Sequence, residues 1–304
     1  MQKNSLFRDL ALLILLVLSG MFVGTLLASV LIRPFIGIDV LSNLDLLDVN
    51  SSSIESSRVF KFYQFFQVIF SFILPAQLFS RIRSGQSSLN YLGLIPVNKM
   101  HLFLGFLLVL FSSPLVAFLS ELNTSIRFPE SMQSIESSFK LMEEQAQKTT
   151  MIFLKYENVL DLFLNFFIIS LLAALSEELL FRGVLQKILV DGTQRLHIGI
   201  LLTAFIFSAF HLQFYGLIPR FFLGVLLGYA YYFSGSLWVP IVMHFVNNFI
   251  AVLIFVLYKE GLTTIDPMKN EYFGIIGLSI SIIFTLAIVW YWLNYIKKNG
   301  VRLG

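Results

Sequence analysis

The sequence contains no cysteine and few charged residues. The missing cysteine excludes disulfide bonds, a thiolate nucleophile and a metal site with cysteine ligands. Charged residues make up 13% of the 304 residues and hydrophobic residues 57%, whereas an ordinary soluble domain has about 25% charged and about 45–50% apolar residues. This composition indicates an integral membrane protein.

The basic and acidic residues almost balance, with 21 Lys and Arg against 18 Asp and Glu. The basic residues lie mostly beside apolar runs and form no cluster, so the sequence predicts no nucleic-acid partner. Any chemistry has to use carboxylates, imidazoles, hydroxyls or amides. We expect no organic cofactor.

Eight apolar stretches come close to the length of about 20 residues that a helix needs to cross a bilayer. They are residues 10–32, 62–80, 102–122, 159–189, 198–210, 217–233, 237–258 and 273–296. We therefore predict an all-α integral membrane protein, with residues 1–304 forming a single polytopic bundle of about eight transmembrane helices. The first stretch is too long for a signal peptide, so we expect it to stay as an anchor.

Basic residues near the ends of the stretches predict that both termini face the cytoplasm, and the plasma membrane is the expected location. Segment 131–148 places Met132, Ile135, Phe139 and Met142 at helical spacing between polar residues. This pattern predicts an amphipathic helix that lies on the membrane surface or over the bundle.

The fourth stretch carries three ionisable residues, Glu177, Glu178 and Arg182. Each such residue near the centre of a span costs roughly 2.5–3.5 kcal/mol on insertion scales, so all three should face the interior or a water-filled cavity. Glu178 and Arg182 stand four residues apart, the spacing at which a carboxylate and a following cation pair on a helix. Glu177 is left free for another role.

Two histidines and an asparagine also lie deep in apolar sequence. His211 is placed in the fifth stretch, and His244 and Asn248 share one face of the seventh because they are four residues apart. At a rise of 1.5 Å per residue, all three fall at a depth similar to that of Glu177. The polar groups of three helices are therefore predicted to meet.

The residues alone leave several functions open. Glu177 with His211 could activate water, while Asn248 and His244 could stabilise the oxyanion of peptide hydrolysis. Glu177, His211 and His244 are alternatively a reasonable ligand set for Zn²⁺. The same cluster could instead form an ion or proton pathway, or simply hydrogen-bond the helices together.

Three motifs resemble the CAAX protease and bacteriocin-processing (Abi) family of intramembrane endopeptidases. They are Glu177-Glu178-x-x-x-Arg182, Phe207-x-x-x-His211 and His244-x-x-x-Asn248, and the core that resembles the family's catalytic region is residues 159–258. The resemblance implies a bundle of about eight spans with a catalytic cavity open toward the cytoplasm. It implies that Glu177 is the general base, His211 its partner, and His244 with Asn248 the oxyanion stabilisers or contributors to a zinc site.

These observations lead to one hypothesis and two rivals. The hypothesis is an endopeptidase that cleaves a membrane-associated or prenylated, hydrophobic peptide with water activated by Glu177. The rivals are a catalytically silent membrane scaffold or regulator, and an ion-coupled transporter. Arg220 in the sixth stretch is predicted either to extend to the outer interface or to contact a substrate carboxylate, and Gly224-x-x-x-Gly228 to permit close helix packing.

Overall fold

The computed structural model describes residues 3–40, 42–51, 53–85, 88–267 and 274–299, and all regular structure in these ranges is helical. The helices are α1 (Lys3–Ile36), α2 (Ile54–Val68), α3 (Leu74–Ser84), α4 (Ser88–Leu92), α5 (Lys99–Thr124), α6 (Gln133–Leu154), α7 (Val159–Asn165), α8 (Ala173–Leu180), α9 (Gln186–Thr193), α10 (Leu196–Ala209), α11 (Leu217–Ser234), α12 (Trp238–Lys259) and α13 (Gly274–Lys298). Short 3-10 turns lie at Leu44–Leu47, Glu130–Met132 and Phe214–Gly216, and π-helical turns at Ile69–Ile73, Phe166–Leu172 and Phe181–Leu185.

The π-helical turns join shorter helices into long spans. Helices α2 and α3 form one span, and α7, α8 and α9 form another that runs over Val159–Thr193. Seven helical segments of the described chain are long and apolar enough to cross a membrane, and α10 is a shorter apolar helix. The prediction of an all-helical, multi-pass bundle of about eight spans is thus confirmed.

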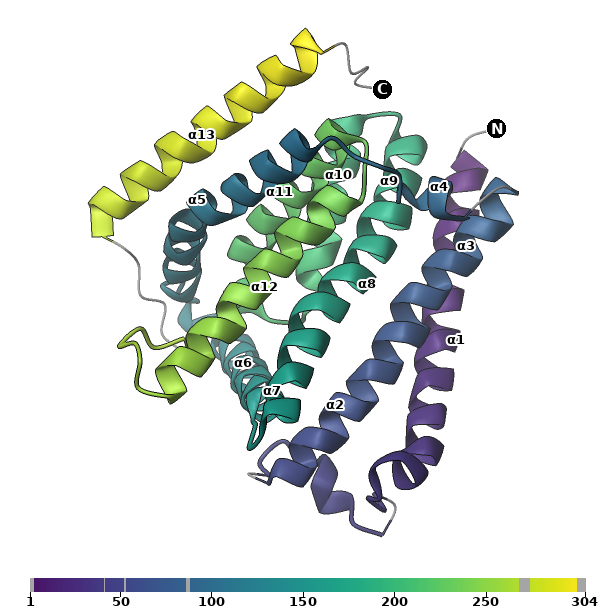
Figure 1. Cartoon of the computed structure of the whole chain (residues 1–304), viewed down its shortest axis with the longest axis vertical. Helices are drawn as coiled ribbons and strands as arrows, with labels where there is room; N and C mark the ends of the chain where they lie inside the picture. Colours follow the sequence, from purple (N-terminus) through teal and green to yellow (C-terminus); the bar gives the residue numbers. More distant parts are fainter. Residues whose placement is uncertain (1–2, 41, 52, 86–87, 268–273, 300–304) are drawn as a thin grey trace.

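The motif-bearing helices lie in the middle of the bundle (Figure 1). Helices α1, α2 and α3 form one edge, and α5 and α13 form the opposite edge, with α8, α10, α11 and α12 between them. A polar cluster on these central helices is therefore separated from the lipid on both sides by apolar helices.

The glycines of α11 let it pack closely against α10, as their spacing predicted. A Cβ atom at Gly224 would lie 3.1 Å from the Cβ of Ala204, and one at Gly228 would lie 2.8 Å from the Ile200 side chain. The carbonyl oxygens of both glycines also accept hydrogen bonds from the fourth span, Gly224 from Arg182 at 3.1 Å and Gly228 from Gln186 at 3.2 Å. The two glycines thus join three helices around the polar cluster.

Helix α6 confirms the amphipathic helix predicted at 131–148, although it begins at Gln133 and continues to Leu154. It lies at the end of the bundle opposite the beginning of α1 and the end of α13 (Figure 1). The Phe139 ring stacks on that of Phe214 at 4.8 Å between centroids. Phe214 belongs to the short turn between α10 and α11, so α6 covers the segment that follows His211.

Candidate active site

The fourth span presents its ionisable residues from a helix that is bounded by two π-helical turns. Glu177 and Glu178 lie on α8, between Phe166–Leu172 and Phe181–Leu185, and Arg182 lies in the second turn. Such turns occur frequently at functional sites because the extra residue rotates the following helix face. The predicted pair forms, with Arg182 Nη1 donating to Glu178 Oε1 at 2.7 Å and neither side chain exposed.

Glu178 also holds a histidine of another helix. The Nδ1 atom of His244 lies 2.8 Å from the same Glu178 Oε1 atom. Since that oxygen accepts a hydrogen bond, Nδ1 carries the donated proton, and the neutral imidazole presents a lone pair at Nε2. The ion pair of the fourth span therefore fixes the orientation of His244 on α12.

Glu177 has a different environment from its neighbour. Its side chain is 21% exposed, whereas that of Glu178 is completely buried, and its Oε2 lies 3.8 Å from Nε2 of His244. The two atoms are both acceptors when the imidazole is neutral, and their separation is wide enough for a bridging water. Glu177 is thus the accessible carboxylate of the cluster.

His211 was predicted inside the fifth span, and this placement is wrong, because α10 ends at Ala209 and His211 lies in the turn that follows. Its Nδ1 donates to the carbonyl oxygen of Phe207 at 2.9 Å, which satisfies one of the carbonyls left free where a helix ends. The next residue, Leu212, has a φ of 55° and turns the chain away from the helix axis. Nε2 of His211 is therefore the ring atom left for other partners.

Phe207 connects the two histidines, a role that we did not assign from the sequence although Phe207 begins the second motif. Its ring meets those of His211 and His244 edge to face, with centroid distances of 5.3 and 5.9 Å. The Arg182 guanidinium lies over the same ring at 4.6 Å. Glu177 lies 3.8 Å from His244, so the contacts around the Phe207 ring gather these residues into one cluster.

Replacing Phe207 by Leu is expected to lower kcat of the predicted peptide cleavage by about 10–100-fold, because a misplacement of catalytic groups by about 1 Å costs up to that factor. Steady-state kinetics on a peptide substrate would measure the loss. The matched control is Phe181→Leu, since the Phe181 ring is equally buried and touches Phe207 at 5.2 Å. Equal losses in the two variants would show that Phe207 only fills space.

Two hydrogen bonds hold the side chain of Asn248. Its Nδ2 donates to the carbonyl oxygen of Ile169 at 3.3 Å, and its Oδ1 accepts from Asn247 at 3.2 Å. Ile169 lies in the π-helical turn before α8. Asn248 therefore ties α12 to the fourth span, and one N–H of its amide is left for a ligand.

The zinc ligands that the sequence suggested are Glu177, His211 and His244. In the part of the chain that the structure describes, no three His, Asp or Glu side chains are arranged to hold a metal ion. Nδ1 of His244 is held by Glu178, and Nδ1 of His211 by the Phe207 carbonyl, so Nε2 is the ring nitrogen that each histidine could offer to a metal. We derive no step through a metal, and zinc binding stays a prediction.

Comparison with known proteins agrees with the motifs. Residues 159–250 match the family model described as type II CAAX prenyl endopeptidase Rce1-like. The uncharacterized protein YpbD of Bacillus subtilis (strain 168) is 37% identical over 82 residues, which are 26% of this chain and 39% of that protein. No solved structure matches this chain.

The region matched by the family model contains all three motifs and the helices that bring them together. The match supports a CAAX-type protease, while the chain covers well under half of the curated relative. The resemblance seen in the motifs is confirmed, since residues 159–250, which contain all three, match a CAAX prenyl endopeptidase model.

Proposed function

We propose that this chain is an intramembrane endopeptidase that hydrolyses a peptide bond in a membrane-associated or prenylated peptide through water activated by Glu177. One observation carries the proposal. Of two adjacent glutamates, Glu178 is buried and neutralised by Arg182, whereas Glu177 is partly exposed and lies 3.8 Å from an imidazole nitrogen. Such a division separates a structural carboxylate from a chemically available one.

The geometry suggests how the water would be held. A water between Glu177 Oε2 and His244 Nε2 can donate a hydrogen bond to each, which directs its oxygen lone pair toward a substrate carbonyl carbon. Glu177 takes one proton as the C–O bond forms and gives it to the leaving amine nitrogen as the C–N bond breaks. Because Nδ1 of His211 donates to Phe207, Nε2 supports the carboxylate in this proton transfer only when it carries a proton.

The oxyanion of the tetrahedral intermediate needs hydrogen-bond donors. The remaining N–H of Asn248 is one candidate, and Nε2 of His244 becomes another when it carries a proton. Both residues are fixed by buried partners, Ile169 and Glu178. Donors held in this way stabilise developing charge without reorganising during the reaction.

The test is cleavage by the purified protein in liposomes. The substrate is a peptide with a prenylated cysteine followed by three aliphatic residues, and the products are identified by mass spectrometry in water enriched in ¹⁸O. Hydrolysis places one ¹⁸O in the new carboxylate. A folded protein that cleaves none of a broad peptide panel would indicate the scaffold, and ion flux without cleavage would indicate the transporter.

Metal analysis tests the zinc alternative separately. Zinc near one ion per chain that disappears in a folded His211→Ala variant would support a metalloenzyme. Full activity after chelation, with no bound metal, would contradict it.

The membrane orientation is accessible to single-cysteine labelling because the chain has no cysteine of its own. Ser138 on α6 and Asp191 on α9 are both exposed, and these two helices lie at opposite ends of the bundle (Figure 1). We expect a membrane-impermeant maleimide to label Ser138→Cys in intact cells and Asp191→Cys only after permeabilisation. The reverse pattern would place the termini outside.

A further inference from the structure

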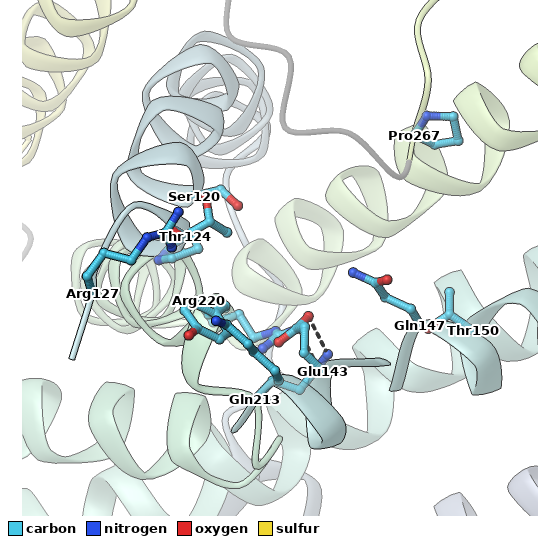
Figure 2. A pocket seen from close by; sticks show the side chains of 13 residues that line it. Ser120, Thr124, Arg127, Glu143, Gln147, Thr150, Gln213, Arg220 and Pro267 are labelled. Atoms are coloured by element: carbon cyan, nitrogen blue, oxygen red, sulfur yellow. Dashed lines mark hydrogen bonds between the residues drawn. The ribbon is translucent and has the colours of Figure 1, made fainter. Parts of the chain in front are cut away.

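A polar cavity of about 490 Å³ lies beside the catalytic cluster, between the end of α5, helix α6 and the turn that follows His211. Figure 2 shows Arg220, Gln213 and Glu143 close together in this cavity, from three different elements. Its volume lies within the range of pockets that bind small ligands. The mechanism proposed above uses none of these three side chains.

Arg220 is held by a chain of hydrogen bonds that leaves part of it unused. Its Nη2 donates to Gln213 Oε1 at 2.5 Å, and Gln213 Nε2 donates to Glu143 Oε1 at 3.1 Å. Arg220 Nη1 and Glu143 Oε2 are buried and have no hydrogen-bond partner among the residues that the structure describes. A buried charged group without a partner is costly, so the free guanidinium nitrogen indicates a missing acceptor.

The backbone next to Arg220 is shaped to receive its guanidinium. A Cβ atom at Gly216 would lie 2.6 Å from Arg220 Cζ and would overlap Nη1 as well. The guanidinium can lie flat against this position only because residue 216 has no side chain. The turn between α10 and α11 therefore leaves space for the Arg220 guanidinium at residue 216.

The cavity adjoins the segment of the chain that carries His211. Gln213, which binds Arg220, follows His211 by two residues in the same turn. A peptide bound at the catalytic cluster can therefore extend into the cavity.

The charge of the cavity selects the ligand class. Three cations, Arg127, Lys140 and Arg220, line it with the single acid Glu143. Lys140 is already paired with Glu136 at 2.7 Å. An arginine fork matches a carboxylate because two parallel N–H groups meet its two oxygens.

We propose that Arg220 binds the C-terminal carboxylate of the peptide substrate in this cavity, a proposal that rests on the proposed endopeptidase function. This contact makes Arg220 a specificity residue, because it favours peptides cut close to a free C-terminus. The other expectation, that Arg220 extends to the outer membrane interface, stays a prediction.

The test compares two forms of the prenylated peptide, one with a free C-terminal carboxylate and one with a C-terminal amide. Binding is measured by fluorescence anisotropy in a Glu177→Gln background, which separates this result from any failure of catalysis. We expect the acid to bind about 10–100-fold more tightly than the amide, the factor typical of a charge-assisted hydrogen bond.

Three variants assign that preference to Arg220. Arg220→Gln should weaken binding of the acid alone, and Gly216→Ala should do the same by displacing the guanidinium. Lys148 lies outside the cavity and pairs with Glu144. Lys148→Gln therefore makes the same charge change elsewhere and should keep the preference for the acid. Thermal melts in detergent identify any variant that fails to fold.

Two results would overturn the proposal. The first is equal binding of the acid and the amide by the Glu177→Gln protein. This result would also be expected if the cavity binds the headgroup of an anionic lipid, which would then compete with both peptides. The second is a loss of affinity for both peptides alike in folded Gly216→Ala and Arg220→Gln.

Discussion

Replacing Glu177 by Gln is expected to lower kcat for peptide cleavage by about 10²–10⁴-fold, the usual contribution of general acid–base catalysis. Glutamine keeps the size of the side chain and one accepting oxygen, so the water can still bind. It cannot take the proton when the C–O bond forms. Because Glu177 is the partly exposed member of the glutamate pair, the change leaves the buried ion pair intact.

The measurement combines single-turnover cleavage with thermal unfolding of both proteins. A preserved melting temperature together with the loss of cleavage assigns the effect to chemistry. Glu144→Gln is the matched control, since Glu144 is an exposed glutamate on α6 that pairs with Lys148. Cleavage by Glu177→Gln at the rate of the parent would rule out Glu177 as the base.

The parts of this site that depend on one helix were predictable from the sequence. The pairing of Glu178 with Arg182 follows from the helical spacing of four residues and from the cost of leaving either charge in lipid. The close packing of α11 follows in the same way from the spacing of Gly224 and Gly228. The amphipathic helix α6 follows from the helical period of its apolar residues. Local geometry determines each of these features.

The features that depend on several helices were not predictable. The contact between Glu178 and His244 joins residues 66 positions apart, and it depends on how α8 packs against α12. The end of α10 before His211 has no glycine or proline to mark it, because the turn instead uses Leu212 in a left-handed conformation. The apolar stretch 198–210 therefore ends almost where α10 does, but nothing in it shows that His211 lies in a turn and not in the span.

The cavity at Arg220 shows the same limit. The sequence identified Arg220 as an unusual charge in an apolar stretch and left two environments open. Its partner Gln213 comes from the turn and binds Glu143 of α6, and these contacts depend on the packing of α6 over that turn. The role of Gly216 depends on the same packing.

Removing one member of the buried ion pair is expected to destabilise the protein by about 3–5 kcal/mol, because the partner is left as an uncompensated buried charge. In Arg182→Met, the Glu178 carboxylate keeps only the hydrogen bond from His244, and Gly224 loses the donor to its carbonyl oxygen. The double variant with Glu178→Gln removes both charges and should recover most of the loss. Unfolding in mixed detergent micelles measures each free energy.

The exposed pair of Glu144 and Lys148 is the control for this cycle. Its atoms are 2.9 Å apart, but the two side chains are 59% and 44% exposed, against none for Glu178 and Arg182. Lys148→Met should therefore change the free energy of unfolding by only about 0–1 kcal/mol. If Arg182→Met were as mild, or if the double variant were no more stable than Arg182→Met, the buried pair would not be what holds α8 and His244 in place. The separation of roles between Glu178 and Glu177 would then lose its structural basis.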